Sequence, residues 1–340
     1  QALDLYYLKM SNQKTLSGML YIKQGSNILY KNSLGSMDSK EKADFNENTY
    51  FQIGSITKMF TAYLCLIAEE QGYIDLDEAV VKYLPETKLP IDLKVKNLLS
   101  NTSGIKDCSL TFWYIRHKGK DFNKENYIKW ARDKKLKYSP GMGWNYSNPG
   151  FALIGIILEK QTGEDAASLY KKWIFTPLGM NNSGFGENPD DTNKAKGTTS
   201  FLGIKWHPKK TDYAMSYTSG NIYSTASDMD LWLEELYSGK LLSKKQKEKM
   251  FFPYFMCYEN TAYGYGCYVE KRKINSEEHK IISHSGGVTG FSTMVSVDLE
   301  TGLKTIIFLN IRHLDNVYLQ EALEADTFKL IQQSLPPDRF

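Results

Sequence analysis

The apolar residues of the chain are unevenly distributed, and one stretch, residues 56–68, is apolar on almost every face of a helix. Only two threonines and Lys58 interrupt it, which is typical of a helix buried inside a large domain. Ser55 precedes the stretch as a predicted N-cap, and Gly72 follows it as a helix stop signal. The pattern therefore predicts a buried central helix with a lysine in its first turn.

Shorter apolar runs near both chain ends have the length and turn chemistry of β-strands. Those predicted in the N-terminal part are residues 18–23, 27–34 and 49–53. Those predicted in the C-terminal part are residues 264–271, 280–283, 291–298 and 304–310. Helical spacing at 2–10 and 315–334 predicts a helix at each end of the chain.

The middle third carries mainly helical patterns, at residues 124–135, 152–162, 165–174 and 227–237. We therefore predict an α/β fold of the α+β type, in which both chain ends build one antiparallel sheet flanked by the terminal helices. Residues 1–340 form a single predicted domain. Its sheet subdomain is expected to comprise 1–72 plus 240–340, and its mainly helical insertion 73–239.

Composition narrows the classes of function. A balance of 42 Lys and Arg against 39 Asp and Glu gives a net charge of +3 with no charged runs, so no nucleic-acid partner is expected. The four cysteines form no Cys-x-x-Cys pair, and the five histidines show no metal-ligand spacing. We expect no metal, and the absence of a dinucleotide fingerprint or P-loop predicts no other cofactor.

Neither end of the sequence carries a targeting or membrane segment. The chain begins at Gln1, and 18 consecutive apolar residues occur nowhere in it. We therefore expect a processed or trimmed protein, with membrane contact only through a removed or missing anchor.

Ser55 and Lys58 are three residues apart, so on a helix they lie on one face about a turn from each other. A serine is a poor nucleophile until a base takes its proton, and an amine can be that base only when it is neutral. Burial and the positive end of a helix dipole both disfavour an ammonium. The pair can therefore be a nucleophile with its base, or an N-capping serine beside a lysine that extends to solvent.

Two further segments carry candidate chemistry. Residues 139–150 form a Gly- and Pro-rich loop in which Tyr146 and Asn148 offer a phenol and an amide, although a solvent turn capped by Asn148 is the alternative. His284 is predicted at the end of a strand, before glycines that allow close backbone approach, or else as an ordinary edge residue. With an ordinary pKa of about 6.5, this histidine is expected to titrate in the working range.

The order of these segments closely resembles that of the penicillin-recognising serine hydrolases. The three motifs are Ser55-x-x-Lys58, Tyr146-x-Asn148 and His284-x-Gly286. The similarity is to the branch with class C β-lactamases, D-alanyl-D-alanine carboxypeptidases with His-x-Gly, and related esterases (peptidase family S12). Further segments that look like this family are 51–61, 97–104, 146–155, 177–180, 219–228 and 284–292. The resemblance implies a β-lactamase/transpeptidase-like fold.

The resemblance also implies a role for each motif residue. Ser55 would be the acylated nucleophile, Lys58 its proton partner, and Tyr146 the general base or a proton shuttle to the leaving group. The residues that would contact substrate are Asn148, at the acyl-side amide, and His284, Ser285 and Gly286. The backbone N–H groups of Ser55 and Gly287 would form the oxyanion hole.

Two features depart from true β-lactamases: His284 stands where a lysine is usual, and the Glu-x-x-Leu-Asn deacylation signature of class A enzymes is absent. We therefore expect an extracytoplasmic serine hydrolase of the bacterial cell envelope, a peptidase or esterase acting on peptide, ester or small-molecule substrates that bear a D-amino acid, with β-lactams as covalent ligands. A class C-like β-lactamase is one alternative. A catalytically weak penicillin-binding or sensor domain is another.

Overall fold

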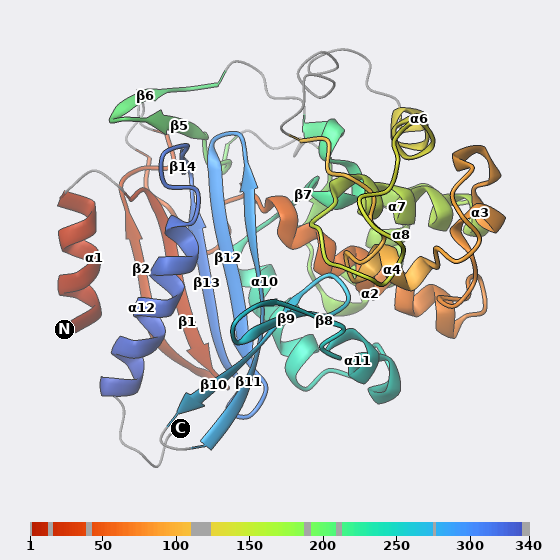
Figure 1. The fold of residues 1–340 in the computed structure, drawn as a ribbon. Coiled ribbons are helices and arrows are strands. Elements are labelled where there is room, and N and C mark those ends of the chain that lie inside the picture. Colours follow the sequence, from red (N-terminus) through yellow and green to blue (C-terminus); the bar gives the residue numbers. More distant parts are fainter. Residues whose placement is uncertain are drawn as a thin grey trace.

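The computed structural model describes residues 2–12, 16–38, 43–109, 124–186, 192–208, 213–274 and 277–334. Eight strands of this described part form one antiparallel sheet (Figure 1). In spatial order they are β2 (Asn27–Leu34), β1 (Gly18–Gln24), β13 (Leu303–Leu309), β12 (Phe291–Asp298), β11 (Glu277–Val288), β10 (Tyr268–Ile274), β9 (Thr261–Tyr263) and β8 (Phe255–Tyr258). Because β1 pairs with β13, with Gly18 opposite Leu309, the predicted sheet built from both chain ends is confirmed.

The two terminal helices lie together on one face of this sheet, as predicted (Figure 1). They are α1 (Ala2–Asn12) and α12 (Leu319–Ser334). The Tyr6 hydroxyl donates to Asp326 at 2.7 Å, and the Tyr7 hydroxyl meets that of Thr327. All residues of β12 and β13 are buried, which follows from the helices that cover both faces of the sheet.

The other face supports the helical region. Its helices are α2 (Thr57–Glu70), α3 (Val80–Tyr83), α4 (Val95–Leu99), α6 (Glu125–Asp133), α7 (Asn148–Thr162), α8 (Ala166–Tyr170), α9 (Thr176–Leu178), α10 (Ala226–Tyr237) and α11 (Lys244–Met250). Helix α10 packs against β12 and β13, while α2 packs against α7. Within the described ranges, no helix combines the length and apolar character needed to cross a membrane.

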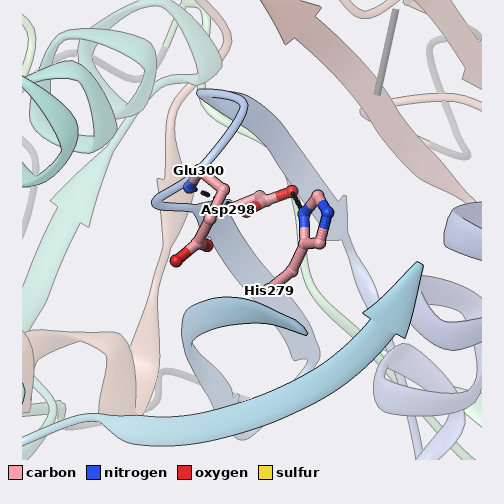
Figure 2. A group of neighbouring side chains, drawn as sticks. All are labelled: His279, Asp298 and Glu300. Atoms are coloured by element: carbon pink, nitrogen blue, oxygen red, sulfur yellow. Dashed lines mark hydrogen bonds and ion pairs between the residues drawn. The ribbon is translucent and has the colours of Figure 1, made fainter. Parts of the chain in front are cut away.

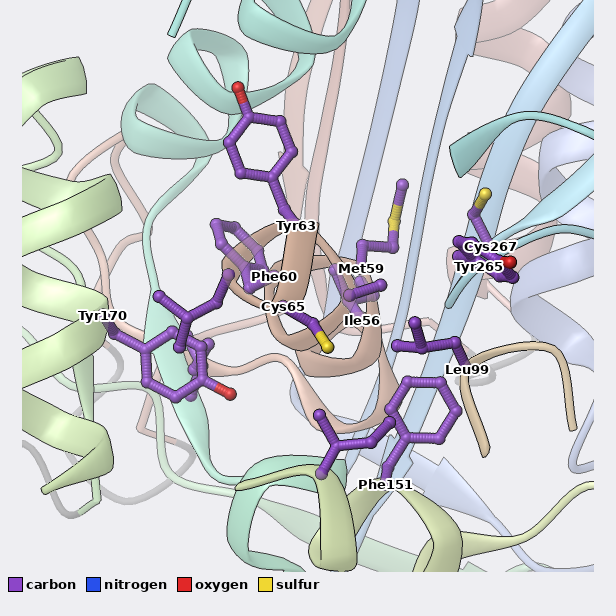
Figure 3. Close-up of a cluster of buried hydrophobic side chains, with 14 of the residues drawn as sticks. Ile56, Met59, Phe60, Tyr63, Cys65, Leu99, Phe151, Tyr170, Tyr265 and Cys267 are labelled. Carbon is purple, nitrogen blue, oxygen red and sulfur yellow. The ribbon is translucent and has the colours of Figure 1, made fainter. Parts of the chain in front are cut away.

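Helix α2 is the centre of the hydrophobic core (Figure 3). Phe60 stacks on Trp232 of α10 with ring centroids 4.0 Å apart, and Tyr63 meets the same indole edge to face at 5.0 Å. The Thr61 hydroxyl, fully buried, contacts the Tyr170 hydroxyl at 2.7 Å and the Thr218 carbonyl at 2.5 Å. The predicted buried central helix is thus confirmed, and Gly72, with φ 77°, follows its end.

The predicted strand at 49–53 is present as the shorter β3 (Phe51–Gln52), outside the eight-stranded sheet, whereas the other short strands of the middle and C-terminal parts were not predicted. Strands β3, β7 (Ile222–Ser224) and β4 (Gly184–Phe185) form one small sheet, and β14 (Ile311–His313), β5 (Thr198–Phe201) and β6 (Ile204–Trp206) form another. The predicted strand at 264–271 is wrong in its first half. A turn with Gly266 at φ 68° separates β9 from β10 there.

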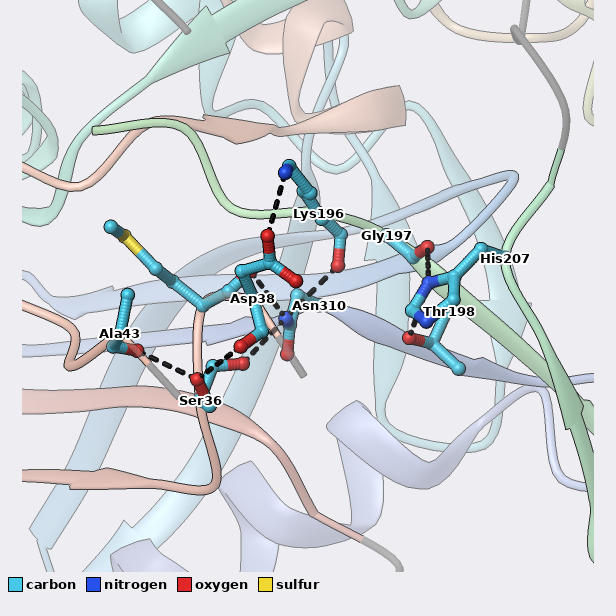
Figure 4. A network of polar contacts seen from close by, with 9 residues as sticks. Ser36, Asp38, Ala43, Lys196, Gly197, Thr198, His207 and Asn310 are labelled. Carbon is cyan, nitrogen blue, oxygen red and sulfur yellow. Dashed lines mark hydrogen bonds and ion pairs between the residues drawn. The ribbon is translucent and has the colours of Figure 1, made fainter. Parts of the chain in front are cut away.

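The side chain of Asn310, directly after β13, joins three distant segments (Figure 4). Its Nδ2 donates to the carbonyls of Ser36 at 3.0 Å and Lys196 at 3.1 Å. Nearby, Lys196 Nζ pairs with Asp38 at 2.6 Å. This polar network ties the N-terminal hairpin and the segment before β5 to the end of β13. The division into two subdomains stays a prediction.

Candidate active site

Ser55 lies in a 3-10 turn, Gly54–Ile56, between β3 and α2. Gly54 has φ 54°, a left-handed conformation that favours glycine. The N-cap of α2 is Ile56, without a side-chain hydrogen bond, so the predicted N-cap role of Ser55 is wrong. The serine hydroxyl instead accepts a hydrogen bond from Lys58 Nζ at 3.1 Å.

Lys58 is completely buried, and its amine has three acceptors around it. Besides Ser55 Oγ, Nζ donates to Asn148 Oδ1 and to the Ser219 carbonyl, each at 2.7 Å. Burial lowers the pKa of Lys58 to about 7, against an opposing effect of the Asp107 carboxylate. Near neutral pH a large fraction of this amine is therefore uncharged and able to accept a proton.

Tyr146 lies beside this pair, with Lys58 Nζ 4.6 Å from the centre of its ring. Desolvation raises the pKa of the Tyr146 phenol well above its ordinary value, although a hydrogen bond with Ser55 opposes the rise. The phenol is therefore protonated at neutral pH. It can pass a proton on, but it does not exist as a phenolate base in the free protein.

Asn148 is the first residue of α7, and the helix N-cap is Ser147, whose Oγ accepts from the Gly150 amide at 3.2 Å. The predicted loop over 139–150 therefore ends earlier than expected, and the alternative of a turn capped by Asn148 is wrong. A helix terminus holds the amide more rigidly than a loop would. This start of α7 directs Oδ1 of Asn148 toward Lys58.

The other side of the Asn148 amide is occupied by a carboxylate and a hydroxyl. Nδ2 donates to Asp107 Oδ1 at 3.1 Å and to Ser109 Oγ at 2.7 Å. The backbone amide of Asn148 donates to the same Asp107 oxygen at 2.9 Å. Both side-chain amide hydrogens of Asn148 are thus already engaged within the protein.

His284 lies inside β11, which continues to Val288, so the predicted position at a strand end is wrong. Its Nδ1 is 2.6 Å from the Ser285 carbonyl, which can only accept, so Nδ1 carries the hydrogen. Nε2 then accepts from the Tyr263 hydroxyl at 3.1 Å. Burial, and secondly the charge of Lys58, lower the pKa of His284 to about 3. The expected titration in the working range is therefore wrong, and the ring is neutral there.

The glycines after His284 allow β11 to contact the nucleophile turn. A Cβ on Gly286 would lie 2.0 Å from the Ile53 carbonyl, and one on Gly54 would lie 2.9 Å from the Gly287 amide nitrogen. The Gly287 N–H is therefore adjacent to the turn that carries Ser55. Ser285 differs from its neighbours, because its hydroxyl bonds Glu321 of α12 on the other face of the sheet.

Some residues of this site carried no recognisable signal in the sequence. Ser219 contributes only a backbone carbonyl, which no side-chain pattern can reveal. Asp107 and Ser109 belong to a segment without periodicity or motif. Tyr263 lies in the short strand β9, which was not predicted.

One group in the described part of the chain has ligand atoms close enough to share a metal ion: His279, Asp298 and Glu300, within 4.8 Å of one another (Figure 2). Asp298 is 2.7 Å from His279 Nδ1 and accepts from the Glu300 amide and the Thr301 hydroxyl at 3.0 and 2.7 Å. These hydrogen bonds indicate that the group stabilises the turn between β12 and β13. His279 is five residues from His284, about 17 Å along β11.

The chain is similar to known proteins in sequence and in fold. A family model described as Beta-lactamase matches residues 9–327. The chain is 27% identical over 355 residues to "Penicillin-binding protein 4*" of Bacillus subtilis (strain 168), covering 95% of this chain and 74% of that protein. It is 27% identical over 252 residues to "Teichoic acid D-alanine hydrolase" of Staphylococcus aureus, covering 72% of this chain and 58% of the relative. The structure of D-amino acid amidase from Ochrobactrum anthropi SV3 superposes with a TM-score of 0.82 at 22% identity, covering 95% and 96% of the two chains.

Proposed function

The chain belongs to the beta-lactamase family, and on that premise we propose that it is a serine hydrolase that acts through a covalent acyl-enzyme on Ser55. One observation carries the proposal. The Ser55 hydroxyl lies 3.1 Å from a buried amine whose pKa is about 7. A neutral amine at hydrogen-bonding distance is what a serine needs to become a nucleophile.

The proposed reaction begins when neutral Lys58 takes the proton of Ser55 as Oγ attacks the carbonyl carbon of the substrate. The oxyanion then accepts hydrogen bonds from the N–H groups of Ser55 and Gly287, each worth about 3 kcal/mol in transition-state stabilisation. The protonated Tyr146 phenol relays a proton to the leaving group as its bond to the carbonyl carbon breaks. Water then attacks the acyl ester, with the same groups removing its proton and returning one to Ser55.

The substrate class we propose is an ester or peptide of a D-amino acid in the bacterial cell envelope, which makes the protein extracytoplasmic. Two of the similar proteins support this choice by their names, the teichoic acid D-alanine hydrolase and the D-amino acid amidase. The neutral His284 ring is also consistent with this substrate class, because it places no permanent positive charge on β11.

Covalent labelling tests the assignment of Ser55. A fluorophosphonate should add one adduct to the native protein, as read by intact mass, and none to Ser55→Ala. The matched control is Ser238→Ala, an exposed serine at the end of α10 that should label like the native protein. An adduct of equal yield on Ser55→Ala would contradict the proposed nucleophile.

A further inference from the structure

Asp107 brings a negative charge to the acyl side of the candidate site. Its Oδ1 accepts from both the backbone and the side-chain amide of Asn148, and its Oδ2 accepts from the Ser109 amide at 3.1 Å. The residue is only partly buried. Within the described ranges, its hydrogen-bond donors are uncharged amides of Asn148 and Ser109, with which the carboxylate forms no ion pair.

Lys58 does not neutralise this carboxylate fully. It contacts the Asn148 amide at Oδ1, whereas Asp107 contacts the same amide at Nδ2. The amine is also uncharged in a large fraction of molecules near neutral pH. A cation placed beside Asp107 by a substrate would therefore meet an acceptor with spare lone pairs, and only part of the molecules would carry a competing charge on Lys58.

The hydrogen bonds of Asn148 also favour a substrate with a positively charged group at this position. Both of its Nδ2 hydrogens are donated to protein acceptors, Asp107 and Ser109, so an acyl-side amide carbonyl finds no free donor there. An N-acylated substrate would have to break one of these bonds, and leave a partly buried acceptor unpaired. A free ammonium brings its own donors to the same acceptors.

We propose that Asp107 binds the free α-ammonium of the acyl group, so that the enzyme prefers unblocked D-aminoacyl esters and amides over N-acylated ones. This inference rests on the proposed acyl-enzyme function and adds its substrate class. The ammonium is attached to the carbon next to the carbonyl that Ser55 attacks, and Asn148 links Lys58, the partner of Ser55, to Asp107 through hydrogen bonds at 2.7 and 3.1 Å. Asp107 is then a specificity-determining residue.

The test compares D-alanine p-nitroanilide with N-acetyl-D-alanine p-nitroanilide at pH 7, where the free α-amine, with a pKa of about 8, is mostly charged. The native protein should favour the free amine at least tenfold in kcat/KM. Asp107→Asn keeps an oxygen that can accept from Asn148 but loses the charge, and the preference should fall to about one. Because the readout is a ratio on one enzyme, any loss common to both substrates cancels.

Ser109→Ala is the matched control, since it removes the other acceptor of Asn148 Nδ2 without changing a charge. The freed Nδ2 hydrogen can serve an N-acyl carbonyl, so the preference should shrink, but it should stay clearly above that of Asp107→Asn because the charge of Asp107 is kept. In the native protein the preference should also decline as the pH rises above about 8, because the amine loses its charge. A preference that is equal in native protein and Asp107→Asn would overturn the inference.

Failure of the proposed function has a different signature. If the fluorophosphonate does not label Ser55, the acyl-enzyme proposal itself is wrong. If Ser55 is labelled and the two anilides are cleaved equally, or neither is cleaved, the nucleophile stands and the ammonium inference is overturned.

Discussion

The environment of the candidate site lowers the pKa of two nitrogen bases, Lys58 and His284, by different amounts. Lys58 has a pKa lowered to about 7 by burial, whereas His284 has one lowered to about 3 by burial and by the charge of Lys58. Between these two values His284 is neutral and Lys58 is mostly charged. Any group that titrates in this site near neutral pH is therefore the lysine and not the histidine.

The pH dependence of ester hydrolysis should reflect this order. For a neutral ester, kcat/KM should rise with pH through about 7 and then level off, because the reacting form of Lys58 is the uncharged amine above its pKa. His284→Gln should leave the midpoint of this rise in place, since it replaces one uncharged group by another. Stopped-assay rates from pH 5 to 9 measure both, and a midpoint that moves by a full unit in His284→Gln would show that the histidine carries charge.

Helix spacing predicted that Ser55 and Lys58 meet, and the family resemblance implied that Asn148 joins them, but neither predicted the protonation of the site. Ser55, Lys58 and Asn148 are in hydrogen-bond contact, which the motif order anticipated. The lowered pKa of His284 depends on its burial and on the charge of Lys58, and its Nε2 accepts from Tyr263, in a strand that sequence periodicity did not reveal. Asp107 could not be found because a single acid in an irregular loop has no pattern.

The N-cap of α7 also positions a residue of the candidate site, because the N-cap residue directly precedes Asn148.

Prediction failed for short elements. Strands β5, β6 and β9 have three or four residues each, which are too few for a period of two to be recognised. Long elements with a continuous apolar pattern, such as α2 and β12, were located correctly.

Removal of the α7 N-cap should lower both stability and activity, whereas removal of the α8 N-cap should lower stability alone. Ser147→Ala should lower the free energy of unfolding by about 1 kcal/mol, because it removes the side-chain acceptor of the Gly150 amide. Asp165→Ala removes the N-cap of α8, where Asp165 accepts from Ser168, and should cost a similar amount. Urea unfolding measures both.

Activity should distinguish these two caps. Only Ser147→Ala should also lower kcat/KM, since only that cap holds Asn148 against Lys58. If both variants have native kcat/KM while being equally destabilised, the start of α7 does not position the site.

On the scale of the whole molecule, one buried ion network joins the middle of the chain to both ends. Lys304 of β13 is 1% exposed and lies 2.5 Å from Asp230 and 2.8 Å from Glu234, both on α10. Asp230 also pairs with Lys23 of β1 at 2.5 Å. These contacts fasten α10 across the strands that the two chain ends contribute.

Loss of Asp230 should therefore be costly. Asp230→Ala leaves the buried Lys304 with a single partner that is half-exposed, and we expect a loss of about 3 kcal/mol in the free energy of unfolding. The matched control is Glu47→Ala, which breaks the exposed pair with Lys31 and should cost far less. Urea midpoints with unchanged slopes provide the comparison, and equal losses would contradict a role for burial.

The pairing of β1 with β13 also constrains how the protein is made. During synthesis the hairpin of β1 and β2 emerges early, yet the edge of β1 stays uncovered until Leu309 has been added. Asn310, which ties Ser36 to Lys196, is added later still. A sheet closed by such distant segments has high contact order, and it folds slowly after most of the chain is complete. Until then the unfinished chain presents an unpaired apolar strand edge, which is a template for pairing with other chains.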